Sequence, residues 1–188
     1  MEHFVENSHS GAKLRIYRNL SSSAPKAVVH ISHGMAEHAG RYAWFMQRLK
    51  EAGYAVYAHD IRGHGHTFAY NSSKGHFCEK NGLDKILHDL DFVIDLIKQN
   101  HPNIPIFCFG HSLGSILLLR YATQAYHRIN GIACWNSGIE TNLLAIIGRI
   151  ILSTERKFMD PRKRSFFAWR LTFQSWANKI KNKKTDFD

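Results

Sequence analysis

The pentapeptide Gly110-His111-Ser112-Leu113-Gly114 stands between an apolar segment and an amphipathic one, a placement that few folds allow. Residues 105–109 indicate a buried strand, and residues 113–126 carry the apolar spacing of a helix. A serine at such a junction sits in a strained turn, and small residues two before and two after it let the strand and the helix approach. The pattern predicts an exposed serine hydroxyl at the end of a buried strand.

Apolar strands alternate with helices over the first 135 residues. Buried strands are expected at 27–32, 54–58, 105–109 and 131–135, after a half-buried strand at 14–17. Helical spacing predicts helices at 41–52, 83–100 and 113–126, with a loop over 66–81. This alternation favours an α/β fold, in which a mostly parallel sheet has helices on both faces.

The alternation stops near residue 139, and the remainder has the pattern of helices. We therefore expect a core at residues 1–138 and a helical region at 139–188. The apolar residues of that region are Leu143, Ile146, Ile147, Ile150, Ile151, Phe166, Phe167, Trp169, Leu171, Phe173 and Trp176.

The positive charge is concentrated in the same region. The chain has a formal net charge of +10, and residues 149–188 hold 11 Lys and Arg against 4 Asp and Glu, a net charge of +7. Such a segment suits anionic surfaces, but no nucleic-acid-binding module is recognisable and no nucleic-acid partner is expected. The N-terminal residues lack the features of a secretory signal, and no apolar run reaches the roughly 18 residues of a spanning helix. We expect a cytoplasmic protein, with peripheral contact to an anionic inner membrane face left open.

The cysteines and histidines give no sign of a metal or disulfide site. Cys78, Cys108 and Cys134 are odd in number and widely spaced, so buried free thiols are expected. His64 and His66 have the spacing of a ligand pair, but no third ligand falls at a useful distance along the chain. Neither a metal nor an organic cofactor is expected.

A second segment has the features of an oxyanion hole. Acyl transfer needs two backbone N–H donors facing the developing oxyanion, and the serine turn supplies one of them, from Leu113. The loop at Gly34 and Met35, at the end of the strand at 27–32, is placed to supply the other.

Four segments together resemble the α/β-hydrolase fold and, within it, the monoacylglycerol lipase and lysophospholipase group, whose sequence family is also described as serine aminopeptidase-like. The resemblance covers nearly the whole chain from Leu14. The segments are residues 33–38 with Arg41 and Tyr42, residues 53–54 with 60–65, residues 75–76, and residues 110–114.

The resemblance implies roles for individual residues. Ser112 is the nucleophile, and the amides of Met35 and Leu113 are the oxyanion hole. Gly34 and His111 are substrate-binding, and the helices after residue 139 are a lid over an acyl pocket. The substrate implied is a monoacylglycerol or lysophospholipid ester. Residues 62–65 and His38 look like structural residues of such a fold.

The chain departs from the family where the rest of the catalytic triad is expected. In α/β-hydrolases an Asp or Glu and then a His follow the nucleophile on loops after later strands. His127 is at the far end of the helix that Ser112 starts, about 20 Å away at 1.5 Å per residue, so it is not the base. Asp160, Asp186 and Asp188 fall in the lid-like region. We therefore expect the N-terminal portion of a hydrolase, inactive alone, with a complementing C-terminal fragment as one partner.

Other functions stay open from the sequence. Acyl transfer uses the same fold, whereas epoxide and haloalkane hydrolysis need Asp in place of Ser112. The basic, aromatic region after residue 149 suits either a lid with a solvated face or a non-catalytic protein that binds lipid surfaces. A remnant with no function of its own has the same sequence features.

Overall fold

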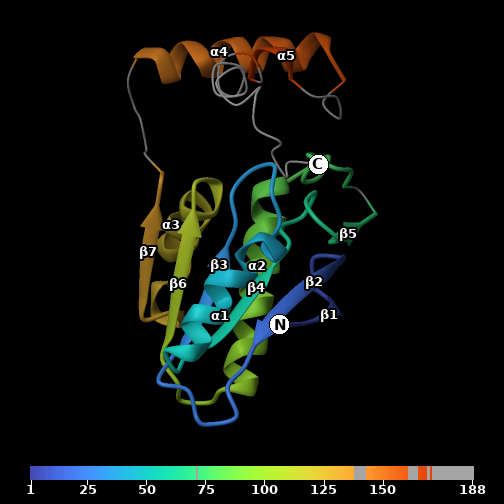
Figure 1. Ribbon diagram of the computed structural model, residues 1–188. Coiled ribbons are helices and arrows are strands. Elements are labelled where there is room, and N and C mark those ends of the chain that lie inside the picture. The colour runs from blue at the N-terminus through green and yellow to red at the C-terminus, as the bar shows by residue number, and fades with distance from the viewer. Residues whose placement is uncertain (71, 138–142, 161–164, 169, 171–188) are drawn as a thin grey trace, which may run out of the picture. The chain divides into compact units, whose positions relative to one another are not determined.

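The computed structural model describes residues 1–70, 72–137, 143–160, 165–168 and 170 (Figure 1). It forms two compact units, Met1–Gly138 and Ile139–Asp188. The strands of the first unit are β1 (Glu2–Asn7), β2 (Ala12–Asn19), β3 (Val28–Ser32), β4 (Ala55–His59), β5 (Phe68–Ala69), β6 (Ile106–His111) and β7 (Gly131–Trp135). Its helices are α1 (Ala43–Glu51), α2 (Gly82–Asn100) and α3 (Leu113–Ala125), with 3-10 turns η1 (Ala39–Tyr42) and η2 (Tyr126–Arg128).

The strands form one sheet in the order β1-β2-β4-β3-β6-β7, and β5 pairs with β2. The pairs β4–β3, β3–β6 and β6–β7 are parallel, whereas β1, β2 and β5 join by antiparallel pairing. The α/β class and the mostly parallel sheet expected from the sequence are confirmed. The strands β1 and β5 were not expected, and the two-residue strand β5 lies within the segment that was predicted to be a loop.

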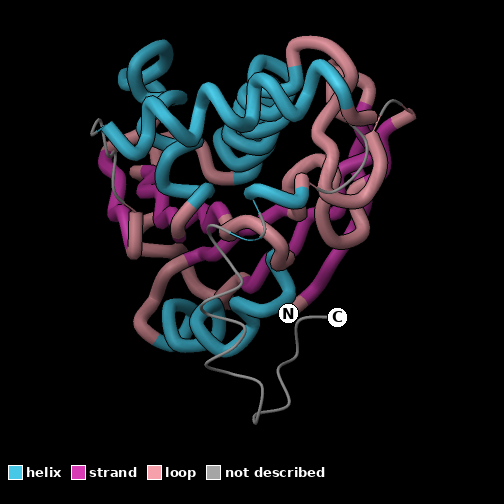
Figure 2. The backbone as a smooth tube through the Cα atoms, turned by 90° about the horizontal axis from the view of Figure 1, so that it is seen from above, coloured by secondary structure: helices cyan, strands magenta, loops and turns pink. Residues whose placement is uncertain are grey.

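Helices cover both faces of the sheet, as expected. On one face α1 packs Met46 against Ile31 and Val56 of the central strands. On the other face α2 and α3 pack against β2, β4 and β6. In Figure 2 the strands form a layer with helical segments on either side. Successive residues of a strand point to opposite faces, which is why both sides of β3 and β4 are apolar.

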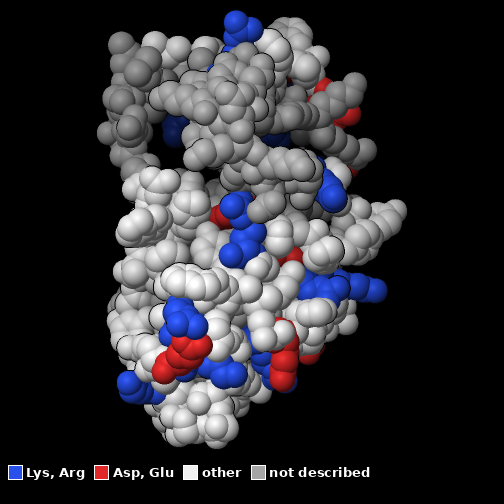
Figure 3. Space-filling view, viewed as in Figure 1, with Lys and Arg blue, Asp and Glu red and all other residues white. Residues whose placement is uncertain are grey.

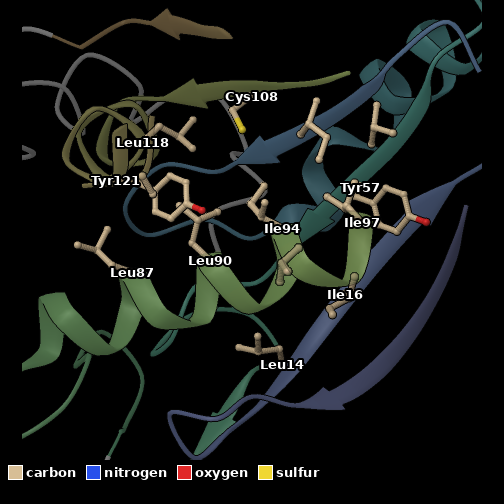
Figure 4. Packing of buried hydrophobic residues seen from close by; sticks show 14 of the residues in the cluster. Leu14, Ile16, Tyr57, Leu87, Leu90, Ile94, Ile97, Cys108, Leu118 and Tyr121 are labelled. Carbon is tan, nitrogen blue, oxygen red and sulfur yellow. The ribbon is translucent and has the colours of Figure 1, made fainter. Parts of the chain in front are cut away.

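The larger core lies between the sheet and the helices α2 and α3. Figure 4 shows α2 side chains pointing toward the sheet, where they meet residues of β2, β4 and β6. The residues labelled there are all buried: Leu14, Ile16, Tyr57, Leu87, Leu90, Ile94, Ile97, Cys108, Leu118 and Tyr121. This core holds β3 and β6, and therefore the loops that follow them, in fixed positions.

The prediction that residues 131–135 form a buried strand is wrong. Strand β7 forms at these positions, but within the described residues it pairs with β6 alone and ends the sheet. Cys134 and Trp135 are consequently exposed. The expectation of three buried thiols therefore holds for Cys78 and Cys108 and fails for Cys134. An apolar run shows that a strand tolerates burial on both faces, not that neighbours cover it.

The second unit contains α4 (Leu143–Phe158) and α5 (Phe166–Ala168). Ile146, Ile150 and Phe158 of α4 are exposed. Among the described residues no helix is long and apolar enough to cross a membrane. Several predicted positions lie outside the described residues, namely Trp169, Leu171, Phe173, Trp176 and residues 181–188.

Charged side chains of both signs are interspersed on the face of the first unit seen in Figure 3. The sequence places the larger part of the basic excess in residues 149–188.

Candidate active site

Ser112 lies in a strained turn between β6 and α3. Its φ of 50° and ψ of −114° are unusual for any residue other than glycine. The main chain on both sides holds this conformation. The Ser112 amide donates to the carbonyl of Trp135 at 2.9 Å, and the Ser112 carbonyl accepts from the Ser115 amide at 3.0 Å. This geometry is the strained strand-to-helix turn that the pentapeptide predicts.

The glycines on either side of Ser112 are required by close approaches. A Cβ on Gly110 would lie 2.6 Å from the Cα of Ser115, and one on Gly114 would lie 2.0 Å from the carbonyl oxygen of Ser32. The helix α3 thus contacts the main chain of β3 and β6 directly. Neither position has room for a side chain, which explains their spacing around Ser112.

The loop after β3 lies beside this turn because β3 and β6 are parallel neighbours. Ser32 pairs with Gly110, so the residues that follow them meet at the carboxyl edge of the sheet. His33 fixes the start of the loop: its Nδ1–H donates to the Gly34 carbonyl at 2.7 Å, and its Nε2 accepts from the Ile61 amide at 2.9 Å. Burial lowers the pKa of His33 to about 4, so the ring is neutral at pH 7.

Gly34 and His111 are brought together by Glu37, a residue to which the sequence analysis gave no role. Oε1 of Glu37 accepts hydrogen bonds from the Gly34 amide at 2.5 Å, the Tyr42 hydroxyl at 2.8 Å and Nδ1–H of His111 at 2.9 Å. A Cβ on Gly34 would lie 2.7 Å from Oε1 of Glu37 and 2.9 Å from Nδ1 of His111. A side chain at position 34 would therefore have to displace the Glu37 carboxylate or the His111 imidazole.

The electrostatics of Glu37 favour its ionised form. Burial alone would raise the pKa of Glu37, but the hydrogen bonds from His111, Tyr42 and the Gly34 amide outweigh it and hold the pKa below its usual value. Burial and the neighbouring Glu37 carboxylate raise the pKa of Tyr42, which keeps its hydroxyl a donor. Arg41 adds an ion pair, with Nη1 3.6 Å from Oε2 of Glu37.

Asp60, which follows β4, fixes the far end of the same loop. Its Oδ1 accepts from the Ala39 amide at 2.8 Å, and its Oδ2 accepts from the His66 amide at 2.8 Å. Asp60 is fully buried, and its carboxylate fills the space beside Gly65. The loop that carries Gly34 and Met35 is thus held at both ends, by Glu37 and by Asp60.

The remaining predicted donors lie on these two segments. Met35 follows Gly34 in the loop and Leu113 follows Ser112 at the start of α3. The Met35 side chain is 53% exposed, and its amide has no hydrogen-bond acceptor within the described part of the chain. The structure therefore gathers Ser112, Leu113 and His111 on one segment and Gly34 and Met35 on its neighbour.

Comparison with known proteins agrees with this arrangement. The sequence pattern of the family described as serine aminopeptidase, S33, matches residues 23–182. The chain belongs to this family. The S33 chain is also 32% identical over 110 residues to the monoglyceride lipase of Rattus norvegicus, and 36% identical over 100 residues to the monoacylglycerol lipase of Mycolicibacterium smegmatis. These matches cover 58% and 53% of the S33 chain and 34% of each lipase.

The fold of the S33 chain is that of the α/β-hydrolases. A thermostable carboxyl esterase from Bacillus coagulans, solved in complex with glycerol, superimposes with a TM-score of 0.70 and 26% sequence identity. The superposition covers 98% of the S33 chain and 59% of the esterase. The chain thus spans about a third of the length of the two lipases and little more than half of the esterase.

Of the residues after Ser112 that were weighed as its base or acid, the structure places His127 away from Ser112. His127 lies in η2, beyond the C-terminal end of α3, whereas Ser112 precedes its N-terminal end. Asp160 follows α4 in the second unit, and Asp186 and Asp188 lie outside the described residues.

The segment 62–65 is built into the core of this S33 chain. Arg62 is buried and pairs with Asp89 of α2, with Nε 3.0 Å from Oδ2. His64 donates from Nδ1 to the Arg62 carbonyl at 3.2 Å. In the described part of the chain, no three His, Cys, Asp or Glu residues come together as a metal site. These contacts support a structural role for the segment.

Proposed function

We propose that this chain carries the nucleophile and oxyanion hole of a serine hydrolase that acts on carboxylic esters. The observation that carries the proposal is Ser112, which is held at positive φ between β6 and α3 by close packing at Gly110 and Gly114. A sheet strand, a strained serine and a helix N-terminus in this order present the hydroxyl to a bound ester. Membership of the S33 family supports a serine nucleophile, and the names of the lipase relatives support an ester substrate.

In the proposed reaction, Oγ of Ser112 attacks the ester carbonyl, and the carbonyl oxygen becomes an oxyanion that accepts from the amides of Met35 and Leu113. Collapse of the tetrahedral intermediate releases the alcohol, which takes up the proton removed from Ser112, and leaves an acyl-enzyme, which water hydrolyses to the free acid and Ser112. A histidine must take the proton from Ser112, and an acid must orient that histidine. Neither the formation of the acyl-enzyme nor its hydrolysis requires a metal or an organic cofactor.

We further propose that the isolated chain turns over esters very slowly. Among the described residues no histidine nitrogen hydrogen-bonds Oγ of Ser112, and His127 is at the opposite end of α3 from Ser112. Loss of the triad histidine typically lowers turnover about a millionfold. The base and the acid would then come from a polypeptide segment that completes the sheet beyond β7.

The substrate class we propose is a monoacylglycerol or lysophospholipid ester. The names of the rat and mycobacterial relatives support a glyceride with one acyl chain. The helices after residue 139 would cover the acyl chain as a lid. A cytoplasmic location, near the inner face of the membrane, fits such a substrate.

Labelling with a fluorophosphonate probe tests the role of Ser112, because the probe reacts with activated serines of any substrate preference. We expect slow labelling of the chain that disappears in Ser112→Ala and persists in Ser23→Ala, a control in an exposed loop. Rapid labelling at Ser112 would show that a base reaches it within this chain. Equal labelling of the wild-type chain and Ser112→Ala would refute the proposed nucleophile.

A second function, binding to anionic lipid surfaces, is favoured by one observation on α4. Ile146, Ile147 and Ile150 are exposed on a helix that also carries Arg149 and Arg156. An amphipathic basic helix of this kind binds at membrane interfaces. Co-sedimentation with vesicles should rise with their anionic lipid content and fall in Ile150→Asp. Binding that ignores lipid charge would exclude this function.

A further inference from the structure

One oxygen atom of Glu37 connects the two segments that carry the proposed oxyanion donors. Oε1 accepts from the Gly34 amide, one residue before Met35, and from Nδ1–H of His111, one residue before Ser112. The Glu37 side chain is only 9% exposed, so water competes little for these bonds. These two hydrogen bonds, called the bridge below, therefore connect the loop after β3 (residues 33–38) to the serine turn (residues 110–114).

The bridge fixes orientation as well as distance. Three donors converge on Oε1, from the Gly34 amide, the Tyr42 hydroxyl and the His111 imidazole, and Arg41 lies 3.6 Å from Oε2. Hydrogen bonds to a charged acceptor are stronger than neutral ones, and several from different segments restrict its motion. The Gly34 amide is used in this bridge, which leaves the next amide, that of Met35, for a ligand.

An oxyanion hole depends on the separation of its two donors. Electrostatic stabilisation requires both N–H groups to be held about 3 Å from the same oxygen before the reaction begins. The Leu113 amide is held in the first turn of α3. Met35 lies in a loop, and its exposed side chain contributes little packing that would hold the loop in place. A contact that ties this loop to the serine turn therefore sets the geometry of the pair.

We propose that Glu37 is a positioning residue, which holds the Met35 amide in register with the Leu113 amide by tying Gly34 to His111. The inference rests on the proposed function of Ser112. Glu37 does not touch the reacting atoms in this scheme. Its effect is on how well the site binds a tetrahedral, negatively charged group.

Binding of an alkylboronic acid measures this effect without turnover. The boron atom accepts an electron pair from Oγ of Ser112 while that hydroxyl loses its proton to solvent, and the anionic tetrahedral adduct places one of its hydroxyl oxygens in the oxyanion hole. We expect Glu37→Ala to weaken boronate binding by about 10- to 100-fold. Glu37→Gln keeps an acceptor oxygen at the same place and should stay within about 3-fold of the wild-type chain.

Two controls separate positioning from stability. Glu51→Ala removes an exposed glutamate of α1 and its ion pair with Arg48, and boronate affinity should not change. Ile97→Val lowers stability from the core of α2 without approaching the site, and affinity should again not change. Wild-type affinity in Glu37→Ala, with binding lost in Ser112→Ala, would overturn the proposal while leaving the role of Ser112 intact.

Hydrogen exchange tests the bridge independently of Ser112. In Glu37→Ala, amide exchange should become faster in both segments 33–38 and 108–114, and in Glu37→Gln it should stay near that of the wild-type chain. Faster exchange in 33–38 alone would show that Glu37 does not connect the two segments. If boronate binding is equal in the wild-type chain and Ser112→Ala, the proposed function fails, and the exchange result still decides whether the bridge exists.

Discussion

Gly114, in the first turn of α3, lies directly against the main-chain carbonyl of Ser32 at the end of β3, so that a Cβ on Gly114 would be 2.0 Å from that oxygen. The contact places the start of α3 against the carboxyl end of β3. The serine turn and the loop after β3 are adjacent for this reason, before any side chain contributes.

Replacing Gly114 with alanine should therefore destabilise the first unit strongly. The new methyl group meets main chain, which cannot move aside as a flexible side chain does, so we expect a loss of about 3 kcal/mol or more. Urea unfolding of Gly114→Ala measures it. Gly148→Ala is the matched control, because nothing lies within 4 Å of that position in α4, and alanine there should be neutral or stabilising by up to about 1 kcal/mol.

Asp89→Ala should destabilise the chain by about 3–5 kcal/mol, because it leaves a charged guanidinium buried without its partner. Arg62 and Asp89 form two contacts, from Nε to Oδ2 at 3.0 Å and from Nη2 to Oδ1 at 3.2 Å, and both side chains are almost fully buried. Glu51→Ala breaks the exposed pair with Arg48 and should cost at most about 1 kcal/mol. Similar decreases in the free energy of unfolding for Asp89→Ala and Glu51→Ala would contradict the burial of the Arg62–Asp89 ion pair.

Stability should fall steeply with acidity below pH 6.5. Burial lowers the pKa of His33 to about 4, and burial also lowers the pKa values of His30 and His59, whose rings contact each other at 3.0 Å inside the sheet. Below the usual histidine pKa of 6.5 the unfolded chain binds protons that the folded chain excludes, so the free energy of unfolding decreases. The His33 shift alone corresponds to roughly 3 kcal/mol, present above pH 6.5 and lost by about pH 4.

Urea titrations at pH 7.5, 6.5, 5.5 and 5.0 give the slope. Each histidine contributes up to about 1.4 kcal/mol per pH unit. Replacing both His30 and His59 with leucine removes two of the groups and should flatten the slope between pH 6.5 and 5.0. An unfolding free energy that is constant from pH 7.5 to 5.5 would show that these histidines titrate normally.

Local patterns were enough to predict most of the fold. Apolar runs and helical spacing predicted β3, β4, β6 and helices α1 to α3, because each element repeats one pattern over several residues. Strand β1 was not predicted, because its mostly exposed residues follow no apolar pattern. The exposure of β7 was not predicted either, because it depends on which strands lie beside β7 rather than on the residues of β7 itself.

The candidate site was only partly predictable. The pentapeptide around Ser112 and the loop at Gly34 are sequence-local, so their spacing identifies them. Glu37 and Asp60 act through contacts with residues distant in sequence, His111 in one case and Tyr17 and Ala39 in the other. Glu37 follows the loop glycine Gly34 by three residues, which marks it as a candidate for contact with this loop. Its partner His111 could not be identified without the register of β3 and β6.

The exposure of β7 predicts that the three thiols differ in reactivity. Cys134 is exposed, whereas Cys108 is buried in the core and burial raises its pKa to about 12. Cys134 should react with a disulfide reagent at least about 100-fold faster than Cys108 in the folded chain.

Cys134→Ser should remove this fast phase, and Cys108→Ser, which replaces a thiol of the buried core, should leave it unchanged. A slow Cys134 in the native chain, with fast reaction of all thiols in urea, would mean that β7 is covered in solution, either by the rest of this chain or by a second copy of it. Dilution distinguishes a second copy from a cover within the same chain, because a second copy dissociates and the fast phase of Cys134 returns.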